Sequence, residues 1–231
     1  MGPERRADRP GFGGDRLLRY LYLVALVALN AHSFFTMPSW QPDTWQRLGQ
    51  MAIRDFNGIE PYSFTLFVLF GMFSLLLAVL ILLDGRYQRF PAWPFALSMM
   101  VLGPSMVFLY QFFRRDAAEP AHPPSKLEEL ACSRVLPLVI IAISLGALWD
   151  GRGGSFDALI ELFRTDYITH AMVVDECLFI ILTPILVAQD CRREGRSAGW
   201  IWAALLLPIV GACLYLASTR RGADTELPAA A

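Results

Sequence analysis

The chain has 231 residues, of which 55% are hydrophobic and 13% aromatic, and its mean hydropathy is +0.42. This composition is too apolar for an ordinary soluble domain, and the formal net charge of −1 gives no sign of a nucleic-acid partner. Charged residues are nearly absent from several blocks of 15–22 residues and crowd between them, a pattern that favours an integral membrane protein.

Six apolar runs of roughly membrane-spanning length follow one another along the chain. They cover residues 17–35, 62–83, 93–113, 135–149, 169–189 and 200–217. Tryptophan and tyrosine gather near the ends of these runs, as an interfacial belt requires. We therefore expect an all-α, polytopic integral membrane bundle of about six transmembrane helices, with five or seven as alternatives.

The first run resembles a signal peptide because arginines precede it. It lacks a small-residue cleavage site, so we expect a retained helix. With a cytoplasmic N-terminus, the inside segments would hold 11 Lys and Arg and the outside segments 9. This small excess favours a cytoplasmic N-terminus. We expect a multi-pass protein of the bacterial inner membrane or its equivalent.

The second half of the chain repeats features of the first half at an offset of 106 residues. The matched boundary residues are Asp84 with Asp190 and Arg114-Arg115 with Arg220-Arg221. Short amphipathic stretches at 43–56 and 154–167 precede the matched runs and are expected on the membrane surface. A three-helix unit would then occur twice. Because three crossings is an odd number, the second copy would be inverted.

This interpretation divides the chain into five parts. They are a basic tail (1–16), a first three-helix repeat (17–115), a polar linker (116–133), a second three-helix repeat (134–221) and a C-terminal tail (222–231).

Several features of the second repeat also carry a family resemblance. They are Asp175, Arg192-Arg193, Trp200, Pro208 and Arg220-Arg221. On these features it resembles a bacterial and cyanobacterial family of small membrane proteins built from a three-helix domain of unknown function. The duplicated form resembles six-helix proteins of photosynthetic bacteria, most closely in "DGRYQRFPAWPF" at 84–95. The resemblance implies a fold and no particular activity.

The fifth run carries two adjacent acids, Asp175 and Glu176, about 10 Å below its start. Two central acids would cost about 5–7 kcal/mol on insertion, roughly what the apolar residues of this run return. The helix should therefore insert only if the acids are neutral, paired or hydrated. A simpler alternative places them near the interface, hydrated, as a topological marker or an interhelical hydrogen bond.

Helical spacing predicts where these acids point. Four polar residues recur every seven positions and share one stripe, which should face the bundle interior. They are Thr169, Glu176, Thr183 and Asp190. The first-half counterparts of the two acids are Leu69 and Phe70, so the acids belong to one copy only.

The predicted site centres on this seam. Asp175 and Glu176 are the candidate catalytic residues if the protein is an enzyme. The candidate ligand-binding residues are His170, Thr183, Asp190 and Asn30. Under the six-crossing topology, Asn30 and His32 lie on the face opposite to the start of the fifth run, which argues against contact between them and the acids. The four cysteines have no zinc spacing, and we predict neither a metal nor a cofactor.

Three functions are compatible with these features. The first is non-catalytic binding of an isoprenoid, a lipid, a second copy or another membrane protein, among surrounding membrane lipids. The second is a membrane-embedded isoprenoid or lipid cyclase or isomerase that uses a buried carboxylic acid. Paired three-helix units resemble the membrane-embedded carotenoid cyclases, although the PxE-type motif of that family is missing. The third is proton-coupled transport.

Overall fold

The computed structural model of this protein describes residues 14–55, 58–115, 120–123 and 125–218. Within these ranges it is built from helices and contains no strand, which confirms the predicted all-α class. The helices are α1 (Gly14–Phe35), α2 (Thr44–Ala52), α3 (Pro61–Gly85), α4 (Trp93–Leu102), α5 (Ser105–Phe113), α6 (Lys126–Ala131), α7 (Val135–Gly151), α8 (Phe156–Thr165), α9 (Tyr167–Glu194), α10 (Gly199–Leu206) and α11 (Pro208–Ser218).

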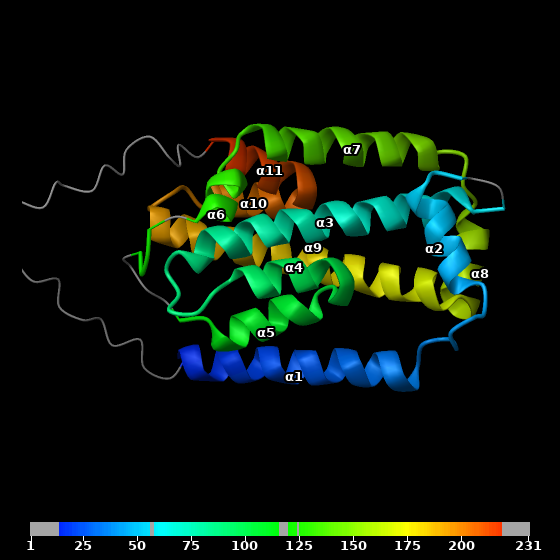
Figure 1. The fold of residues 1–231 in the computed structure, drawn as a ribbon, viewed down its shortest axis with the longest axis horizontal. Coiled ribbons are helices and arrows are strands. Elements are labelled where there is room, and N and C mark those ends of the chain that lie inside the picture. The colour runs from blue at the N-terminus through cyan, green and yellow to red at the C-terminus, as the bar shows by residue number, and fades with distance from the viewer. Residues whose placement is uncertain (1–13, 56–57, 116–119, 124, 219–231) are drawn as a thin grey trace, which may run out of the picture.

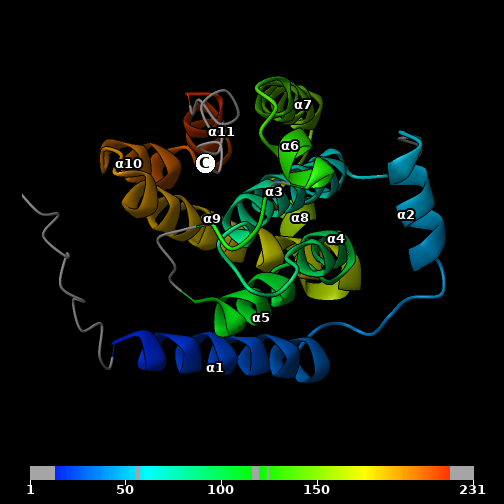
Figure 2. The ribbon, with the colours of Figure 1, turned by 60° about the vertical axis from the view of Figure 1, so that its left-hand side comes forward.

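Helices α3 and α9 form the centre of the bundle, side by side along its long axis (Figures 1 and 2). Helix α3 also contacts α7 and α4, and α1 packs on the outside against α5. Between Leu66 and Leu83, α3 has one polar side chain, Ser74. A helix that is apolar all round is typical of a buried position, and Leu76, Leu77 and Ile81 are fully buried.

Three helices are long and apolar enough to cross a bilayer, namely Leu17–Phe35 within α1, α3 and α9. Helix α7 has 17 residues, and α7 and α8 taken together, with a bend of 103° between them, are a fourth candidate span. The structure is therefore compatible with a membrane protein, but with fewer crossings than the six expected.

The expected span at 93–113 is instead two short helices, α4 and α5, that fold back on each other (Figure 1). The chain reverses at Gly103, whose φ of +55° suits glycine, and at Pro104. The ring of Phe95 lies 5.6 Å from that of Tyr110, whereas 15 residues of continuous helix would separate them by about 22 Å.

Helices α10 and α11 form a second hairpin where the sixth span was expected. The break lies at Leu207 and Pro208, and the rings of Trp200 and Tyr215 are 5.8 Å apart. Gly211 of α11 lies so close to α10 that an added Cβ would be 2.1 Å from the carbonyl oxygen of Ala203. Arms of about 12–17 Å cannot cross a hydrocarbon core of about 30 Å, so both hairpins are too short to be spans.

The expected inversion of the second half is wrong. Helices α3 and α9 run in the same direction, as do α1 and α7 (Figure 1). Near the start of both helices, Ser63 Oγ and Thr169 Oγ1 are 3.3 Å apart, and further along, the rings of Phe73 and Phe179 lie 5.9 Å apart. The physical reason is that each hairpin returns to the side from which it started. Each half then offers at most two candidate spans, an even number, instead of the three expected.

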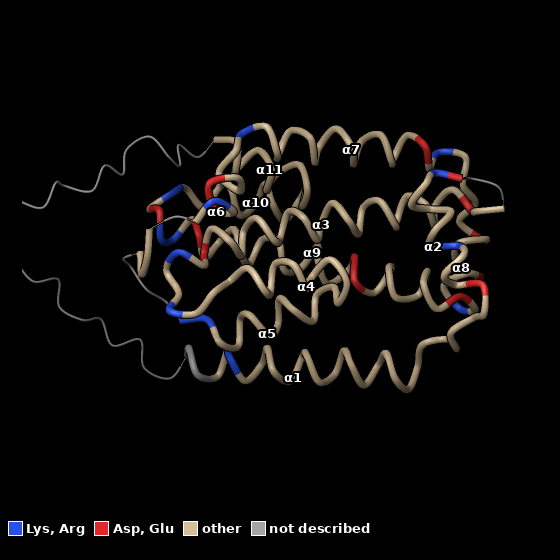
Figure 3. Tube along the Cα trace, viewed as in Figure 1, with Lys and Arg blue, Asp and Glu red and all other residues tan. Residues whose placement is uncertain are grey.

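Charged residues gather at the two ends of the bundle (Figure 3). We call one the arginine-rich end, where α1 and α7 start and α3, α5, α9 and α11 finish. The basic residues with described side chains there are Arg19, Arg86, Arg89, Arg114, Arg115, Lys126, Arg134, Arg192, Arg193 and Arg196. At the opposite end, the α2–α8 end, those of the described chain are Arg47, Arg54, Arg152 and Arg164.

Candidate functional site: a buried acid on a polar seam

The polar stripe predicted from the sequence is buried along its whole length. We call these residues the polar seam, and their exposed fractions are Thr169 0%, Glu176 7%, Thr183 0% and Asp190 6%. The seam lies on the face of α9 that packs against α3, because Thr169 contacts Ser63 and Phe179, on the same face, contacts Phe73. The predicted inward orientation is therefore confirmed.

The seam begins with a fully hydrogen-bonded helix cap. Asp166 accepts hydrogen bonds from the backbone N–H of Thr169 at 2.8 Å and from its hydroxyl at 2.7 Å. Arg47 of α2 pairs with the same carboxylate at 2.5 Å. Glu60 caps α3 in the same way by accepting from the N–H of Ser63 at 3.0 Å. These two acids stabilise the starts of α9 and α3, and their carboxylates already have hydrogen-bond partners there.

Glu176 has no such partner. Its side chain is buried, and Oε1 has no hydrogen-bond donor within the part of the chain that the structure describes. One turn further along the same face of α9, the ring of Phe179 packs 5.7 Å from Phe70 and 5.9 Å from Phe73. An unpaired carboxylate beside an aromatic cluster would cost several kcal/mol, so a bound proton, a cation or an ordered water would stabilise this group.

Asp175 is half-buried and lies against the tip of the first hairpin. An ideal Cβ on Gly103 would be 2.5 Å from Asp175 Oδ2, which shows how closely the carboxylate approaches the turn. Helix α5 starts at Ser105, directly after this turn, so its positive N-terminal end is near the acid. In Figure 3 an acidic segment of α9 lies midway between the charged ends, beside that turn. The acid pair therefore lies deep inside the bundle.

The far end of the seam is hydrogen-bonded again. Thr183 donates its hydroxyl to the carbonyl of Phe179 at 2.7 Å. Asp190 accepts a hydrogen bond of 2.5 Å from the hydroxyl of Tyr215 on α11. The first half has a matching pair, in which Tyr110 of α5 donates to Asp84 of α3, also at 2.5 Å. Each hairpin thus attaches its returning arm to the end of a central helix.

A buried ion cluster joins the two halves at the arginine-rich end. Asp84 accepts from Arg114 Nε and Nη2, both at 3.0 Å, and also pairs with Arg193 of α9. The Arg193 guanidinium lies 3.9 Å from the ring centroid of Tyr87 and 4.0 Å from Asp190. Two guanidinium groups facing two carboxylates give a balanced cluster, which is typical of a structural tie.

Of the remaining predicted ligand-binding residues, His170 is part of a buried contact and Asn30 is not. His170 is buried, and its Nε2 lies 3.1 Å from Nε2 of His32 on α1. We expected the end of α1 and the start of α9 on opposite faces, and this placement was wrong, because both lie at the same end of the bundle, where His32 meets His170 (Figure 1). Asn30 is exposed and donates to the carbonyl of Leu26 in its own helix at 2.8 Å, so the structure does not bring it to the site.

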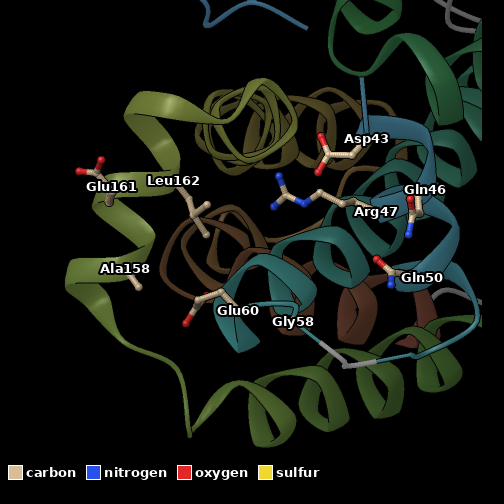
Figure 4. A pocket seen from close by; sticks show the side chains of 9 residues that line it. All are labelled: Asp43, Gln46, Arg47, Gln50, Gly58, Glu60, Ala158, Glu161 and Leu162. Atoms are coloured by element: carbon tan, nitrogen blue, oxygen red, sulfur yellow. The ribbon is translucent and has the colours of Figure 1, made fainter. Parts of the chain in front are cut away.

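A pocket of about 580 Å³ opens at the α2–α8 end (Figure 4). Asp43, Arg47 and Gln50 line it from one side and Leu162 from the other. Glu60 also lines it and lies ten residues, about 15 Å along α3, before Phe70 at the level of Glu176. This pocket is therefore separate from the acid pair, and most of the side chains that line it are polar or charged. Among the described residues, no three His, Cys, Asp or Glu side chains are grouped to hold a metal ion.

The sequence did not predict the His32–His170 pair at one end of the bundle, nor the tyrosines and the Asp84 cluster at the other end. The tyrosines carried a usable signal, since Tyr110 and Tyr215 each follow a matched aspartate by 26 and 25 residues. The Arg193 contact spans 109 residues and depends on the parallel packing of α3 and α9, which the sequence does not reveal.

Comparison with known proteins adds no homologue to this geometry. No family model, no curated protein and no solved structure matches the chain.

Proposed function

We propose that this protein is a multi-pass membrane protein that binds and releases a proton at Glu176, as the coupling site of a transporter. The observation that carries the proposal is the buried Glu176 carboxyl group with an unpartnered oxygen. An acid buried at membrane depth is costly to insert, so acids of this kind are rare. Those that occur often form proton relays. Glu176 would be the proton acceptor and Asp175 its neighbour at the hairpin tip.

The hairpins support this proposal. Non-helical backbone at membrane depth is found where it is buried in protein or lines a polar cavity, and discontinuous helices often surround transport sites. Gly103 and Pro104 provide such a break directly beside Asp175. A turn at this depth can move relative to α9 without unwinding a complete span. It is thus suited to open or close access to the acids.

The charge distribution supports an orientation. In the described chain the arginine-rich end carries far more Lys and Arg than the α2–α8 end, a much larger contrast than six crossings would give. By the positive-inside rule we place the arginine-rich end, with the start of α1 and the end of α11, in the cytoplasm. We also propose that the halves are a parallel duplication, with their axis along the membrane normal.

The direct test is proton flux in proteoliposomes under an imposed pH gradient. We expect Glu176→Gln to abolish flux, because an amide holds no exchangeable acidic proton at this position. Glu194→Gln is the matched control: it changes an exposed acid of the same helix and should leave the flux unchanged. Equal flux through both variants and the wild type would refute the proposal.

Binding of a hydrophobic ligand and acid-catalysed cyclisation remain predictions from the sequence. Both need an apolar pocket next to the acid pair, and the pocket at the α2–α8 end, with its mixed polar and apolar lining, does not supply one. An isoprenoid or lipid co-purifying with the wild type and absent from Glu176→Gln would favour these functions over transport.

A further inference from the structure

At the α2–α8 end, two histidines from opposite ends of the sequence share one hydrogen bond. His32 Nε2 and His170 Nε2 are 3.1 Å apart, and their rings are inclined by 30° with centroids 5.3 Å apart. His170 is buried, and the ring of Phe163 on α8 stacks against it at 4.3 Å and 8°. The pair therefore joins α1, α8 and α9 at the outer end of the polar seam.

The hydrogen bonds around the pair assign its protons. His170 Nδ1 lies 2.8 Å from the carbonyl oxygen of Phe163, which can only accept, so this nitrogen carries a proton. In a neutral His170, Nε2 must then be the acceptor, and the proton between the rings belongs to His32 Nε2. His32 Nδ1 is left as an acceptor for the hydroxyl of Thr36, 2.5 Å away.

The same geometry has room for one additional proton. Thr36 Oγ1 is also 2.6 Å from the carbonyl oxygen of His32, so the hydroxyl can rotate and donate there. His32 Nδ1 can then take up a proton and donate to Thr36 Oγ1, while the proton between the rings can pass to His170. A second additional proton would place two N–H groups face to face at 3.1 Å, which the pair cannot satisfy.

We propose that His32 and His170 form a one-proton site at the outer mouth of the polar seam. Its biological role, collecting protons for Glu176, rests on the function proposed above. His170 and Glu176 lie six residues, about 9 Å, apart along α9, so the pair delivers protons to the seam and not directly to the carboxyl group.

The charged residues on the helices around the pair balance one another. Asp166 lies one turn before His170 on α9, but Arg47 of α2 neutralises it. Helix α8 has Arg164 next to Phe163 and Glu161 two residues before it, which offset each other, and α1 has no charged residue after Arg19. A metal ion between the rings would need further ligands, and no group of three metal-binding side chains occurs within the described chain.

The test is nitrogen-15 NMR of histidine-labelled protein in lipid nanodiscs. The background is His122→Gln, which removes the third histidine, a loop residue outside the pair. In the neutral pair we expect a proton on Nδ1 of His170 and on Nε2 of His32; when one proton is added, one ring and not both becomes imidazolium. Thr36→Val should change the His32 signals, whereas Ser33→Ala, whose hydroxyl bonds Leu29, should not.

Two results would overturn the one-proton site: the same tautomer in both rings, or both rings doubly protonated at the same time. Stoichiometric Zn²⁺ binding that shifts both ring signals would also overturn it, in favour of a metal site. Because these signals do not depend on transport, they can support the pair even if Glu176→Gln leaves flux intact. Conversely, they can refute the pair while the flux experiment supports Glu176.

Discussion

The two central helices are alike at their ends and different in the middle. Helices α3 and α9 each begin with an acidic cap, Glu60 or Asp166, and each ends at an aspartate that accepts a tyrosine hydroxyl. At the tenth residue of each helix, α3 has Phe70 where α9 has Glu176. Features present in both helices are sufficient to explain the architecture. The buried acid is present in only one helix, so packing does not require it, and function is its best explanation.

The largest expected effect separates the two matched aspartates. Asp84→Asn removes the carboxylate that faces Arg114 and Arg193, and should lower the free energy of unfolding by about 3–5 kcal/mol. Asp190→Asn weakens the hydrogen bond from Tyr215 and removes the longer ion pair with Arg193, and should cost about 1.5–3 kcal/mol. Denaturant unfolding in detergent micelles measures both. Equal losses would show that the Arg193 contact does not join the halves.

The two hairpins should respond differently to one added methyl group. Gly211→Ala places a Cβ against the backbone of Ala203, which cannot move aside easily, and should cost about 1–3 kcal/mol. Gly103→Ala meets the side-chain carboxylate of Asp175, which can rotate, but requires alanine at a positive φ, for about 1–2 kcal/mol. The same unfolding assay compares them, and a clearly larger loss for Gly103→Ala would contradict this ranking.

The smallest expected effect on stability is at the residue to which we assign the function. Glu176→Gln preserves the shape of the side chain and removes no hydrogen bond from Oε1, so the free energy of unfolding should change by less than about 1 kcal/mol. A loss of several kcal/mol in the same assay would mean that Glu176 has a structural role comparable to that of Asp84.

The sequence predicts the helical class and the seam well, because a seven-residue polar period places Thr169, Glu176 and Thr183 on one face of any helix. It fails at the hairpins. An apolar run with a central Gly103-Pro104 is equally compatible with a kinked span, since neighbouring helices can satisfy the freed backbone groups. Because three crossings were expected in the first half, the second half was expected to be inverted. The same count placed His32 and the start of α9, with His170, on opposite faces. One turn therefore accounts for most of what the sequence could not reveal.

The most direct test of the central claim is infrared difference spectroscopy of the protein in lipid as the pH is raised. The wild type should show the carbonyl stretch of a protonated carboxyl group that disappears on deprotonation, and Glu176→Gln should lack this band. A wild type without the band, or a variant that keeps it unchanged, would contradict proton binding at Glu176.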